Sequence, residues 1–437
     1  MRSYNLDSLQ FPNPGLYHMD SYERLNTRMK ITVAGGGAAG IFAAISCKEK
    51  NSSADITVLE QGDKPLVKVA LSGGGRCNLT NSITDPVQLS TFYPRGSREL
   101  IGPFQRFNSA DTVNWFQSHG VSLKREPDGR VFPESDKSES IVKCLLDTAE
   151  KTGVKIRKNC GLTSAITSPQ KGGFDLLTSD GSSGYCDLLL LATGGSPDSA
   201  GIRIAASVGH TIIDQIPSLF SFVITDSRIS SIPGISLQKA LISLPQTRFS
   251  SAGPVLITHN GISGPAVLKL SSLAARELHA KEYKTTCRID WFPDSTLEQT
   301  LQILSGNRKL IAGKKIFGEP PLKIPRRLWN SLAEASGCGS DQHWADLSKK
   351  QAAEIAAQIH KCELKITGKD RNKEEFVTCG GVKLSEISFK TMQSKLYPSL
   401  FFAGELLDID GLTGGFNLQA AWTTGWIAGE GMALFKQ

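Results

Sequence analysis

Short apolar runs and helix-like stretches follow one another along the first part of the chain. The apolar run Ile31–Ala34 predicts a buried parallel strand. A glycine-rich turn follows it, and a helix-like stretch then covers Ile41–Lys50. A second strand is predicted over Asp55–Leu59 and ends at Glu60. This order of strand, turn, helix and strand is typical of a parallel α/β sheet.

The turn between the first strand and the helix has the spacing Gly-x-Gly-x-x-Gly. Its glycines allow a tight turn, a close approach of backbone to a pyrophosphate, and close packing of helix on strand. Free N–H groups at the start of the helix favour phosphates, and a carboxylate about twenty residues further on can bind ribose hydroxyls. We therefore predict an adenine dinucleotide site, with a coincidental turn as the alternative. Its residues are Gly35, Gly37, Ala38, Ala39, Gly40 and Glu60.

A second glycine-rich loop, Ser72-Gly-Gly-Gly-Arg-Cys-Asn78, is costly to order. Such loops often touch ligands, so we predict cofactor contacts from Gly74, Gly75, Arg76 and Asn78, with a flexible surface loop as the alternative. Arg76 is expected to neutralise a pyrophosphate or to bind an anionic substrate, unless it is a plain surface arginine. Cys77 is a candidate redox thiol, against the simpler interpretation of a packed side chain.

Two later strands end in similar loops. The run Tyr185–Ala192 predicts a buried strand that leads into Thr193, Gly194 and Gly195. Leu400–Ala403 predicts another strand, and an acidic glycine-rich loop and a helix follow it. Ligands bind at the carboxyl ends of strands in open α/β sheets, so both loops are expected at the cofactor. The last strand is expected to join the first sheet, which makes the cofactor domain discontinuous.

The region between these parts has a different pattern. Short β-like runs separated by Pro and Gly indicate an inserted β-rich, barrel-like unit, and helical spacing follows it. We predict a Rossmann-like domain over residues 29–205 and 376–437, a β-rich domain over 206–292 and 362–375, and a helical insert over 293–361. Residues 1–28 lack any period and are expected to be a disordered tail, so translation is hypothesised to start at Met29.

Composition narrows the class of protein. The chain has 437 residues, 40% of them hydrophobic, and a net charge of +7. No stretch approaches the ~18 apolar residues of a membrane helix, so no membrane partner is expected. The basic residues are scattered, apart from a loose cluster at Arg308-Lys309, Lys314-Lys315, Lys323 and Arg326-Arg327. Such clusters are usually solvated faces, so nucleic acid is the less favoured partner. The nine cysteines form no CxxC pair, which indicates no metal site and suits buried thiols in the cytoplasm. The sequence does not determine the oligomeric state.

The chain resembles the BaiN/YhiN-type NAD(P)/FAD-dependent oxidoreductases, flavoproteins of the two-dinucleotide-binding fold. The resemblance covers almost everything from Met29 onward. Two motifs look specific to that family: Ser72-Gly-Gly-Gly-Arg-Cys-Asn78, and the block from Ala403-Gly-Glu to Gly-Gly-Phe-Asn-Leu-Gln419. The resemblance implies FAD as cofactor and an insert with a barrel-like and a helical part. Glu405 stands where many related folds have Asp, so its ribityl contact is a departure from the wider pattern.

Flavin chemistry suggests roles for further residues. Reduction places negative charge near N1 and O2 of a flavin, and the N–H groups of Gly415, Phe416 and Asn417 are expected to stabilise it. A plain packed helix end is the alternative. Glu405 or Asp408 is expected to bind ribityl hydroxyls. His259 lies in a polar turn and is the candidate acid or base, against a structural histidine.

These observations predict an FAD-dependent oxidoreductase that is reduced by a transient NAD(P)H co-substrate. The reduced flavin then passes hydride through N5 to an unsaturated or keto small molecule. No second Gly-x-Gly-x-x-Gly is present to suggest a separate nicotinamide site. Two alternatives are a flavin-dependent RNA-modifying enzyme and a non-catalytic flavin redox sensor.

Overall fold

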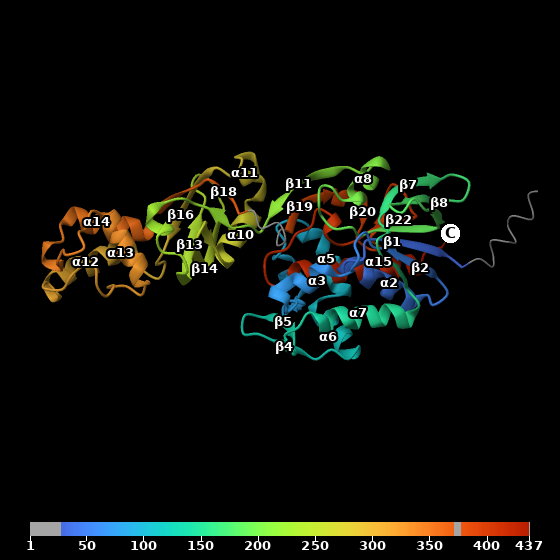
Figure 1. The fold of residues 1–437 in the computed structure, drawn as a ribbon, viewed down its shortest axis with the longest axis horizontal. Helices are drawn as coiled ribbons and strands as arrows, with labels where there is room; N and C mark the ends of the chain where they lie inside the picture. The colour runs from blue at the N-terminus through green and yellow to red at the C-terminus, as the bar shows by residue number, and fades with distance from the viewer. Residues whose placement is uncertain (1–27, 371–376, 437) are drawn as a thin grey trace, which may run out of the picture.

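The computed structural model describes residues 28–370 and 377–436. Residues 1–27 of the predicted disordered tail therefore lie outside the described residues. Three parts follow one another along an elongated molecule (Figure 1). An α/β part built from both ends of the chain lies at one end, a β-rich part lies in the middle, and a helical part lies at the other end. We call them the Rossmann-like domain, the barrel unit and the helical unit.

A seven-stranded sheet forms the centre of the Rossmann-like domain. Its order is β20-β21-β22-β10-β1-β2-β6, and β22, β10, β1, β2 and β6 run parallel. Both faces are covered, and every residue of β10 is fully buried, which suits a leucine-only strand. The strands span Lys30–Ala34 (β1), Asp55–Leu59 (β2), Lys155–Arg157 (β6), Leu188–Leu191 (β10), Ile387–Ser388 (β20), Gln393–Ser394 (β21) and Leu400–Phe402 (β22).

Helices cover this sheet and extend the domain. They span Ala38–Lys50 (α2), Val67–Leu71 (α3), Pro86–Ser90 (α4), Ser97–Arg106 (α5), Ser109–Ser118 (α6), Glu139–Thr152 (α7), Ala200–Ser207 (α8) and Phe416–Ala433 (α15). Short 3₁₀ turns span Ser72–Gly75 (η3), Leu384–Glu386 (η6) and Gly404–Leu406 (η7). The last strand, β22, pairs with β10, so the predicted discontinuous domain is confirmed.

Three smaller sheets complete this end of the molecule. One sheet has the order β3-β5-β4 and another has the order β7-β8-β9, while the pair β11-β19 carries the chain into and out of the insert. Their strands span Thr80–Asn81 (β3), Leu123–Arg125 (β4), Arg130–Pro133 (β5), Leu162–Ser168 (β7), Gly173–Thr178 (β8), Ser183–Cys186 (β9), Ile212–Ser218 (β11) and Val377–Val382 (β19).

The prediction of one continuous strand over Tyr185–Ala192 is wrong in one respect. The chain makes two strands there, β9 and β10, which belong to different sheets. Asp187 separates them, because its N–H donates to the carbonyl of Lys30 at 2.8 Å and its carboxylate accepts from the Lys30 N–H at 2.7 Å. A break of this kind depends on a partner strand that is remote in sequence.

The barrel unit is a second seven-stranded sheet, with the order β17-β16-β13-β14-β15-β12-β18. The two edge strands, β17 and β18, are separated only by Thr367, so one segment pairs with both edges and the sheet curls into a barrel. The predicted barrel-like unit is confirmed. Its strands span Phe222–Val223 (β12), Ser236–Ser243 (β13), Ser250–Thr258 (β14), Gly261–Ser263 (β15), Thr285–Asp290 (β16), Cys362–Ile366 (β17) and Gly368–Lys369 (β18).

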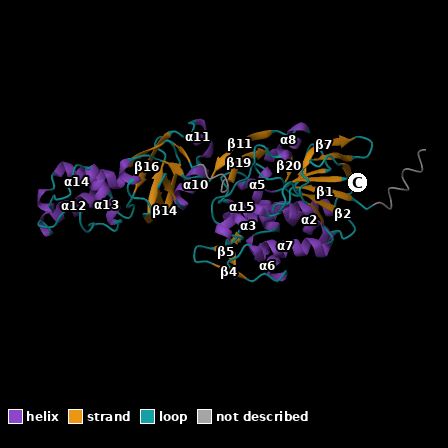
Figure 2. Ribbon diagram, in the orientation of Figure 1, coloured by secondary structure: helices purple, strands orange, loops and turns teal. Residues whose placement is uncertain are grey.

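Helices flank the barrel unit and build the helical unit, which Figure 2 shows as the helix-rich end of the molecule. They span Ser227–Ser230 (α9), Pro265–Leu273 (α10), Ala275–Ala280 (α11), Leu297–Leu310 (α12), Arg326–Ala335 (α13), Trp344–Asp346 (η4) and Lys349–His360 (α14). The barrel and helical units share one hydrophobic core, while the Rossmann-like domain has its own. The numerical domain boundaries stay a prediction.

Two helices from opposite ends of the chain pack very closely in the Rossmann-like domain. A Cβ atom at Gly429 of α15 would lie 2.4 Å from the carbonyl oxygen of Ala43 in α2, and one at Gly425 would lie 2.6 Å from that of Ala39. Nearby, a Cβ at Gly404 would lie 2.8 Å from the Cβ of Ala39. The small residues of α15 therefore set the distance between α15 and α2.

Replacing Gly429 by alanine should force α15 away from α2 and destabilise the protein by about 1–3 kcal/mol. The matched control is Gly102→Ala in α5, where a Cβ meets nothing within 4 Å. Because alanine is the better helix former, Gly102→Ala should be neutral or stabilising by up to about 1 kcal/mol. Thermal and urea unfolding of both variants measures this difference. Equal stability of the two variants would contradict the close packing.

Candidate functional site

The turn before α2 has the geometry of a phosphate cradle. Gly35 has a φ of +111°, and a Cβ there would lie 2.3 Å from the carbonyl oxygen of Ala192. A Cβ at Gly40 would lie 2.0 Å from the carbonyl oxygen of Gly35. A Cβ at Gly37, in contrast, meets no protein atom within 4 Å, and no side chain caps the helix. The N–H groups of the first turn, at Ala38 and Ala39, therefore remain available to an anion in front of Gly37.

Glu60 lies at the end of β2, beside this turn. Its carboxylate accepts the N–H of Gly36 at 2.9 Å and the N–H of Gly62 at 2.7 Å. These bonds fix the carboxylate at the sheet edge and leave one lone pair on each oxygen for a ribose hydroxyl. The position suits the predicted ribose contact.

The glycine loop after α3 presents open backbone. Gly73 and Gly74 are both left-handed inside η3, and a Cβ at Gly74 or Gly75 would meet nothing within 4 Å. Asn78 links this loop to the last helix, because its side-chain oxygen accepts the Gly415 N–H at 3.0 Å in the amide orientation that satisfies both groups. The loop therefore lies next to the start of α15, as a shared ligand would require.

Arg76 is occupied by protein partners. Its guanidinium pairs with Glu126 and with Asp136, at 2.8 Å from the latter, and lies 4.0 Å above the centre of the Phe132 ring. These contacts turn Arg76 towards the β4–β5 hairpin. The structure thus does not favour the predicted pyrophosphate contact of this residue, because Nε and one terminal nitrogen of the guanidinium already donate to these carboxylates.

Cys77 does not suit the predicted redox role. Its side chain is completely buried, and burial raises the pKa of the thiol to about 12. A thiol needs to reach the thiolate form to react readily, and this environment opposes that form. All nine cysteines are buried and free, so Cys77 has no disulfide partner.

The loop after β10 lies beside the loop after β22. Gly194 is left-handed and open, whereas a Cβ at Gly195 would lie 2.8 Å from the Thr378 side chain. Thr193 bonds the hydroxyl of Ser199 at 3.3 Å, which caps α8. Gly194 is thus the member of this predicted trio with backbone open to a ligand.

The two predicted ribityl ligands, Glu405 and Asp408, already bind protein groups. Glu405 accepts the N–H of Thr378 at 2.9 Å and pairs with Lys68 at 2.7 Å. Asp408 accepts the N–H of Gly380 at 3.0 Å and pairs with Arg276 at 3.0 Å. Both carboxylates thus tie the loop after β22 to β19, the strand that leaves the insert.

The start of α15 is held in place without a side-chain cap. Gly415 has a φ of +92°, and a Cβ there would lie 2.5 Å from the Thr80 carbonyl. The amide of Asn417 accepts the N–H of Gly411 and donates to its carbonyl, both at 2.8 Å. The ring of Phe416 stacks on Phe92 at 4.4 Å. The first-turn N–H groups of α15 from Phe416 onward remain free to face negative charge.

Sequence reasoning missed a buried ion pair between Arg95 and Asp410. Both carboxylate oxygens of Asp410 accept from the Arg95 guanidinium. Asp410 also accepts from Ser218 of β11 at 2.8 Å, and Arg95 donates to the Ser272 carbonyl of α10 at 2.7 Å. Burial raises the pKa of the Asp410 carboxyl, and Arg95 opposes that shift. The pair joins four segments where the Rossmann-like domain meets the insert. In the sequence, the acidic loop that contains Asp410 was the one feature that pointed to this region.

His259 lies far from these groups. It is exposed in the turn between β14 and β15, beyond Thr258. The other end of β15, at Ser263, bonds Ser221 at 2.6 Å next to the segment that enters from the Rossmann-like domain. The turn instead adjoins the 231–235 loop, whose Ser231 carbonyl accepts from Arg327 of α13 at 3.3 Å. The structure therefore does not bring His259 to the cofactor residues.

The remaining geometry fits a dinucleotide. Open glycines, two uncapped helix starts and one carboxylate lie at the carboxyl edge of the parallel sheet, where ligands of this fold bind. A pyrophosphate suits the space in front of Gly37, and a ribose suits Glu60. The part of the chain that the structure describes contains no cluster of three His, Cys, Asp or Glu side chains that could hold a metal ion. Within the same residues, no helix has the length and apolarity needed to cross a membrane.

Comparison with known proteins identifies relatives over nearly the whole chain. A family model described as HI0933-like protein Rossmann domain matches residues 29–431. The chain is 28% identical over 422 residues to 3-dehydro-bile acid delta(4,6)-reductase of Clostridium scindens, which covers 92% of this chain and 99% of the relative. It is 27% identical over 418 residues to the ribosomal RNA dihydrouridine synthase of Escherichia coli, with 94% and 99% covered. The corresponding synthase of Haemophilus influenzae is 29% identical over 405 residues, with 90% and 96% covered.

Solved structures give the same fold. The 3-ketosteroid delta1-dehydrogenase of Sterolibacterium denitrificans aligns with a TM-score of 0.50 at 13% identity, over 94% of this chain and 100% of that one. At this identity the likeness shows the fold alone.

Gly37 gives a direct test of the phosphate cradle. Because a Cβ at Gly37 meets no protein atom, Gly37→Val should leave the stability of the cofactor-free protein unchanged. The valine would occupy the space that the pyrophosphate needs, so the affinity for the expected cofactor, FAD, should fall at least tenfold. Titration of FAD by fluorescence and thermal unfolding of the apoprotein measure both effects. Unchanged FAD affinity would place the pyrophosphate elsewhere.

The buried ion pair gives a second test. Arg95→Met leaves the Asp410 carboxylate buried without its partner and should cost about 3–5 kcal/mol of stability. Arg276→Met is the matched control, because the Arg276 side chain is 56% exposed against 12% for Arg95. Its loss should cost less than about 1 kcal/mol. Denaturant unfolding compares the two variants, and similar costs would show that the Arg95 pair is no more than a surface contact.

Proposed function

Because the chain belongs to the HI0933-like family, we propose that it is an FAD-dependent reductase that uses NAD(P)H to saturate a carbon–carbon double bond conjugated with a carbonyl group. The match confirms the resemblance to BaiN/YhiN-type flavoprotein oxidoreductases, so the protein is an enzyme of that kind rather than a non-catalytic sensor. FAD, NAD(P)H and the type of double bond are parts of the proposal.

The chemistry shared by the relatives supports this choice of reaction. One relative is named for reducing delta-4,6 bonds of a 3-dehydro bile acid, and two are named for making dihydrouridine in ribosomal RNA. In both substrates the double bond that gains hydrogen is conjugated with a carbonyl. Steroid and nucleobase differ in shape, so the reacting group is what the two activities have in common.

Different residues of this chain would bind different parts of the cofactor. When bound, FAD would accept a hydride from NAD(P)H and deliver it to the β-carbon of the conjugated bond, while a proton joins the α-carbon. The first turn of α2 would bind the pyrophosphate, and Glu60 would bind the ribose. The N–H groups at Phe416 and Asn417 would face the N1 and O2 edge and stabilise negative charge there. This uncapped start of α15 is the observation that carries the proposal.

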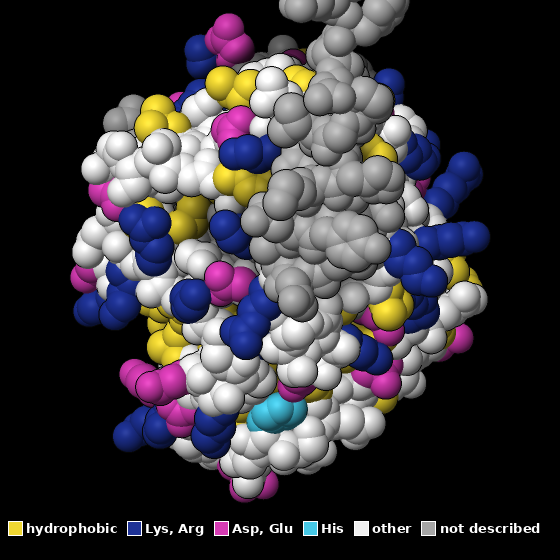
Figure 3. Space-filling model, turned by 90° about the vertical axis from the view of Figure 1, so that its right-hand side faces the viewer, with side chains coloured by type: hydrophobic (Ala, Val, Ile, Leu, Met, Phe, Trp, Pro, Cys, Tyr) yellow, Lys and Arg dark blue, Asp and Glu magenta, His cyan; other side chains and the backbone are white. Residues whose placement is uncertain are grey.

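RNA is the second candidate substrate, and the distribution of charge favours it. Residues 206–375 contain 22 Lys and Arg against 16 Asp and Glu, a net charge of +6 out of +7 for the whole chain. The rest of the chain holds 27 Lys and Arg against 26 Asp and Glu. Basic and acidic side chains both occur on the end face of the Rossmann-like domain (Figure 3). A basic insert suits a polyanionic substrate, whereas a bile acid needs no basic surface of that extent.

An anaerobic isotope experiment tests the reaction. The protein loaded with FAD is mixed with NADH or NADPH deuterated at C4, and then with a steroid 4,6-dienone or a uridine-containing ribosomal RNA fragment. We expect the flavin absorption to bleach with one nucleotide, and mass spectrometry to find one deuterium in a product heavier by two hydrogens. Bleaching without reduction of either substrate would contradict the proposed acceptor, and a flavin that neither nucleotide bleaches would contradict the proposed reductant.

A further inference from the structure

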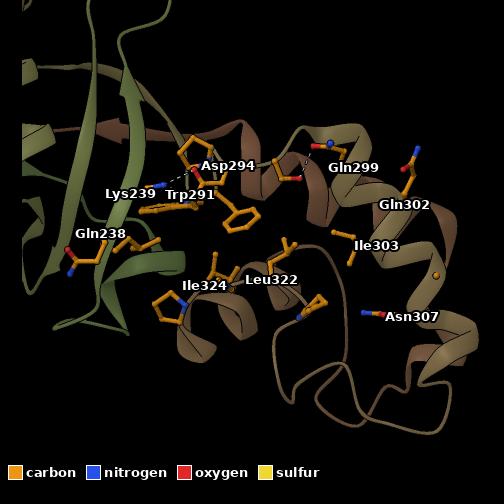
Figure 4. A pocket seen from close by; sticks show the side chains of 18 of the residues that line it. Gln238, Lys239, Trp291, Asp294, Gln299, Gln302, Ile303, Asn307, Leu322 and Ile324 are labelled. Atoms are coloured by element: carbon orange, nitrogen blue, oxygen red, sulfur yellow. Dashed lines mark hydrogen bonds and ion pairs between the residues drawn. The ribbon is translucent and has the colours of Figure 1, made fainter.

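A large groove lies between the barrel unit and the helical unit, remote from the cofactor cradle (Figure 4). It is formed by β13, the segment after β16, α12 and the segment before α13. Its volume of about 1300 Å³ exceeds the ~300–1,000 Å³ of ordinary small-molecule sites. In Figure 1 this junction lies towards the opposite end of the molecule from β1 and α2. The groove therefore cannot be the place where hydride is transferred.

The groove has an apolar floor. Leu322 and Ile324 rise from the segment before α13, and Ile303 faces them from α12 (Figure 4). Ile303 is 38% exposed, and Leu310 at the end of α12 is 80% exposed. Asn307 presents its amide to the same space and can both donate and accept hydrogen bonds. A flat nucleobase could therefore pack against the apolar side chains of this floor and form a hydrogen bond with Asn307.

The rim of the groove has a small excess of positive charge. Among the residues that the structure places in its lining, Asp294 is the single acid, and Lys239 pairs with it at 3.2 Å. Lys323 also lines the groove and is exposed. Arg326 follows this segment and is exposed at the first position of α13, whose N-terminal end adds a positive partial charge. The charge of the rim is thus complementary to a phosphate backbone.

We propose that this groove anchors a single-stranded segment of an RNA substrate, with phosphates on Lys323 and Arg326 and a base on the floor at Ile303. The inference rests on the RNA form of the proposed function. An anchor so far from the cofactor serves only a substrate long enough to reach both places, which RNA is and a steroid is not. Proteins that bind single strands combine cations for the phosphates with side chains, most often aromatic, against which the bases pack.

The test measures binding of a labelled single-stranded, uridine-containing RNA to the FAD-loaded protein at several salt concentrations. Lys323→Glu combined with Arg326→Glu should weaken binding at least tenfold. Loss of two phosphate contacts should also lower the slope of log K against log salt by about 1.4. Ile303→Ser should weaken binding several-fold without changing the slope, because it removes contact with a base and no charge.

The matched control is Lys151→Glu combined with Lys158→Glu, an equal change of charge at exposed positions of the Rossmann-like domain. It should leave RNA binding nearly unchanged. All variants should keep the thermal unfolding midpoint and the flavin absorption spectrum of the FAD-loaded wild-type protein, which shows that they fold. Equal weakening by both charge reversals would overturn the groove as the site.

Two further outcomes separate the inference from the proposed function. A wild-type protein that reduces a conjugated double bond but binds no RNA would overturn the inference and leave the reductase function intact. A wild-type protein that binds RNA in the groove but reduces no conjugated bond would support the site and overturn the proposed reaction.

Discussion

The close approach of α15 to α2 is the constraint on which the cofactor domain depends. Gly425 and Gly429 let α15 lie against the backbone of α2, and Gly404 brings the loop after β22 against Ala39. The turn that would bind the pyrophosphate is therefore supported by residues from the end of the chain. Any larger side chain at these positions would move one half of the cofactor cradle relative to the other. The two parts of the discontinuous domain are thus packed as one unit, although the barrel unit and the helical unit lie between them in the sequence.

The acidic loop between β22 and α15 extends this coupling to the insert. Glu405 and Asp408 accept backbone N–H groups of β19. Asp410 accepts hydrogen bonds from the side chains of Arg95, Ser218 and Ser272. Burying Arg95 and Asp410 removes both charges from water, and this desolvation penalty offsets much of their attraction. The net contribution of the pair to stability is therefore modest, but the pair requires an accurate position of both side chains. We interpret the pair as fixing the orientation of the insert on the Rossmann-like domain. The same loop then leads into α15, so a few residues link the position of the insert to the N–H groups that we propose to face the flavin.

Much of the fold was readable from the sequence, because its signals are local. A side chain at Gly40 would collide with the carbonyl of Gly35, and one at Gly35 would collide with the carbonyl of Ala192. The apolar run of β22 likewise indicated a buried strand. The partners of polar side chains were not readable. Arg76 binds Glu126 and Asp136, and Arg95 binds a carboxylate 315 positions away. His259 stands in a turn whose composition suggested chemistry, yet only the path of β14 and β15 shows that it lies away from the cradle.

A crystal structure of the protein with FAD would show whether the two helix starts hold the cofactor. We expect the pyrophosphate in front of Gly37, the adenosine ribose on Glu60, and the N1 and O2 edge of the flavin ring at the first-turn N–H groups of α15. Density for the flavin ring away from α15, with the helix start capped by another protein group, would show that α15 does not bind the flavin.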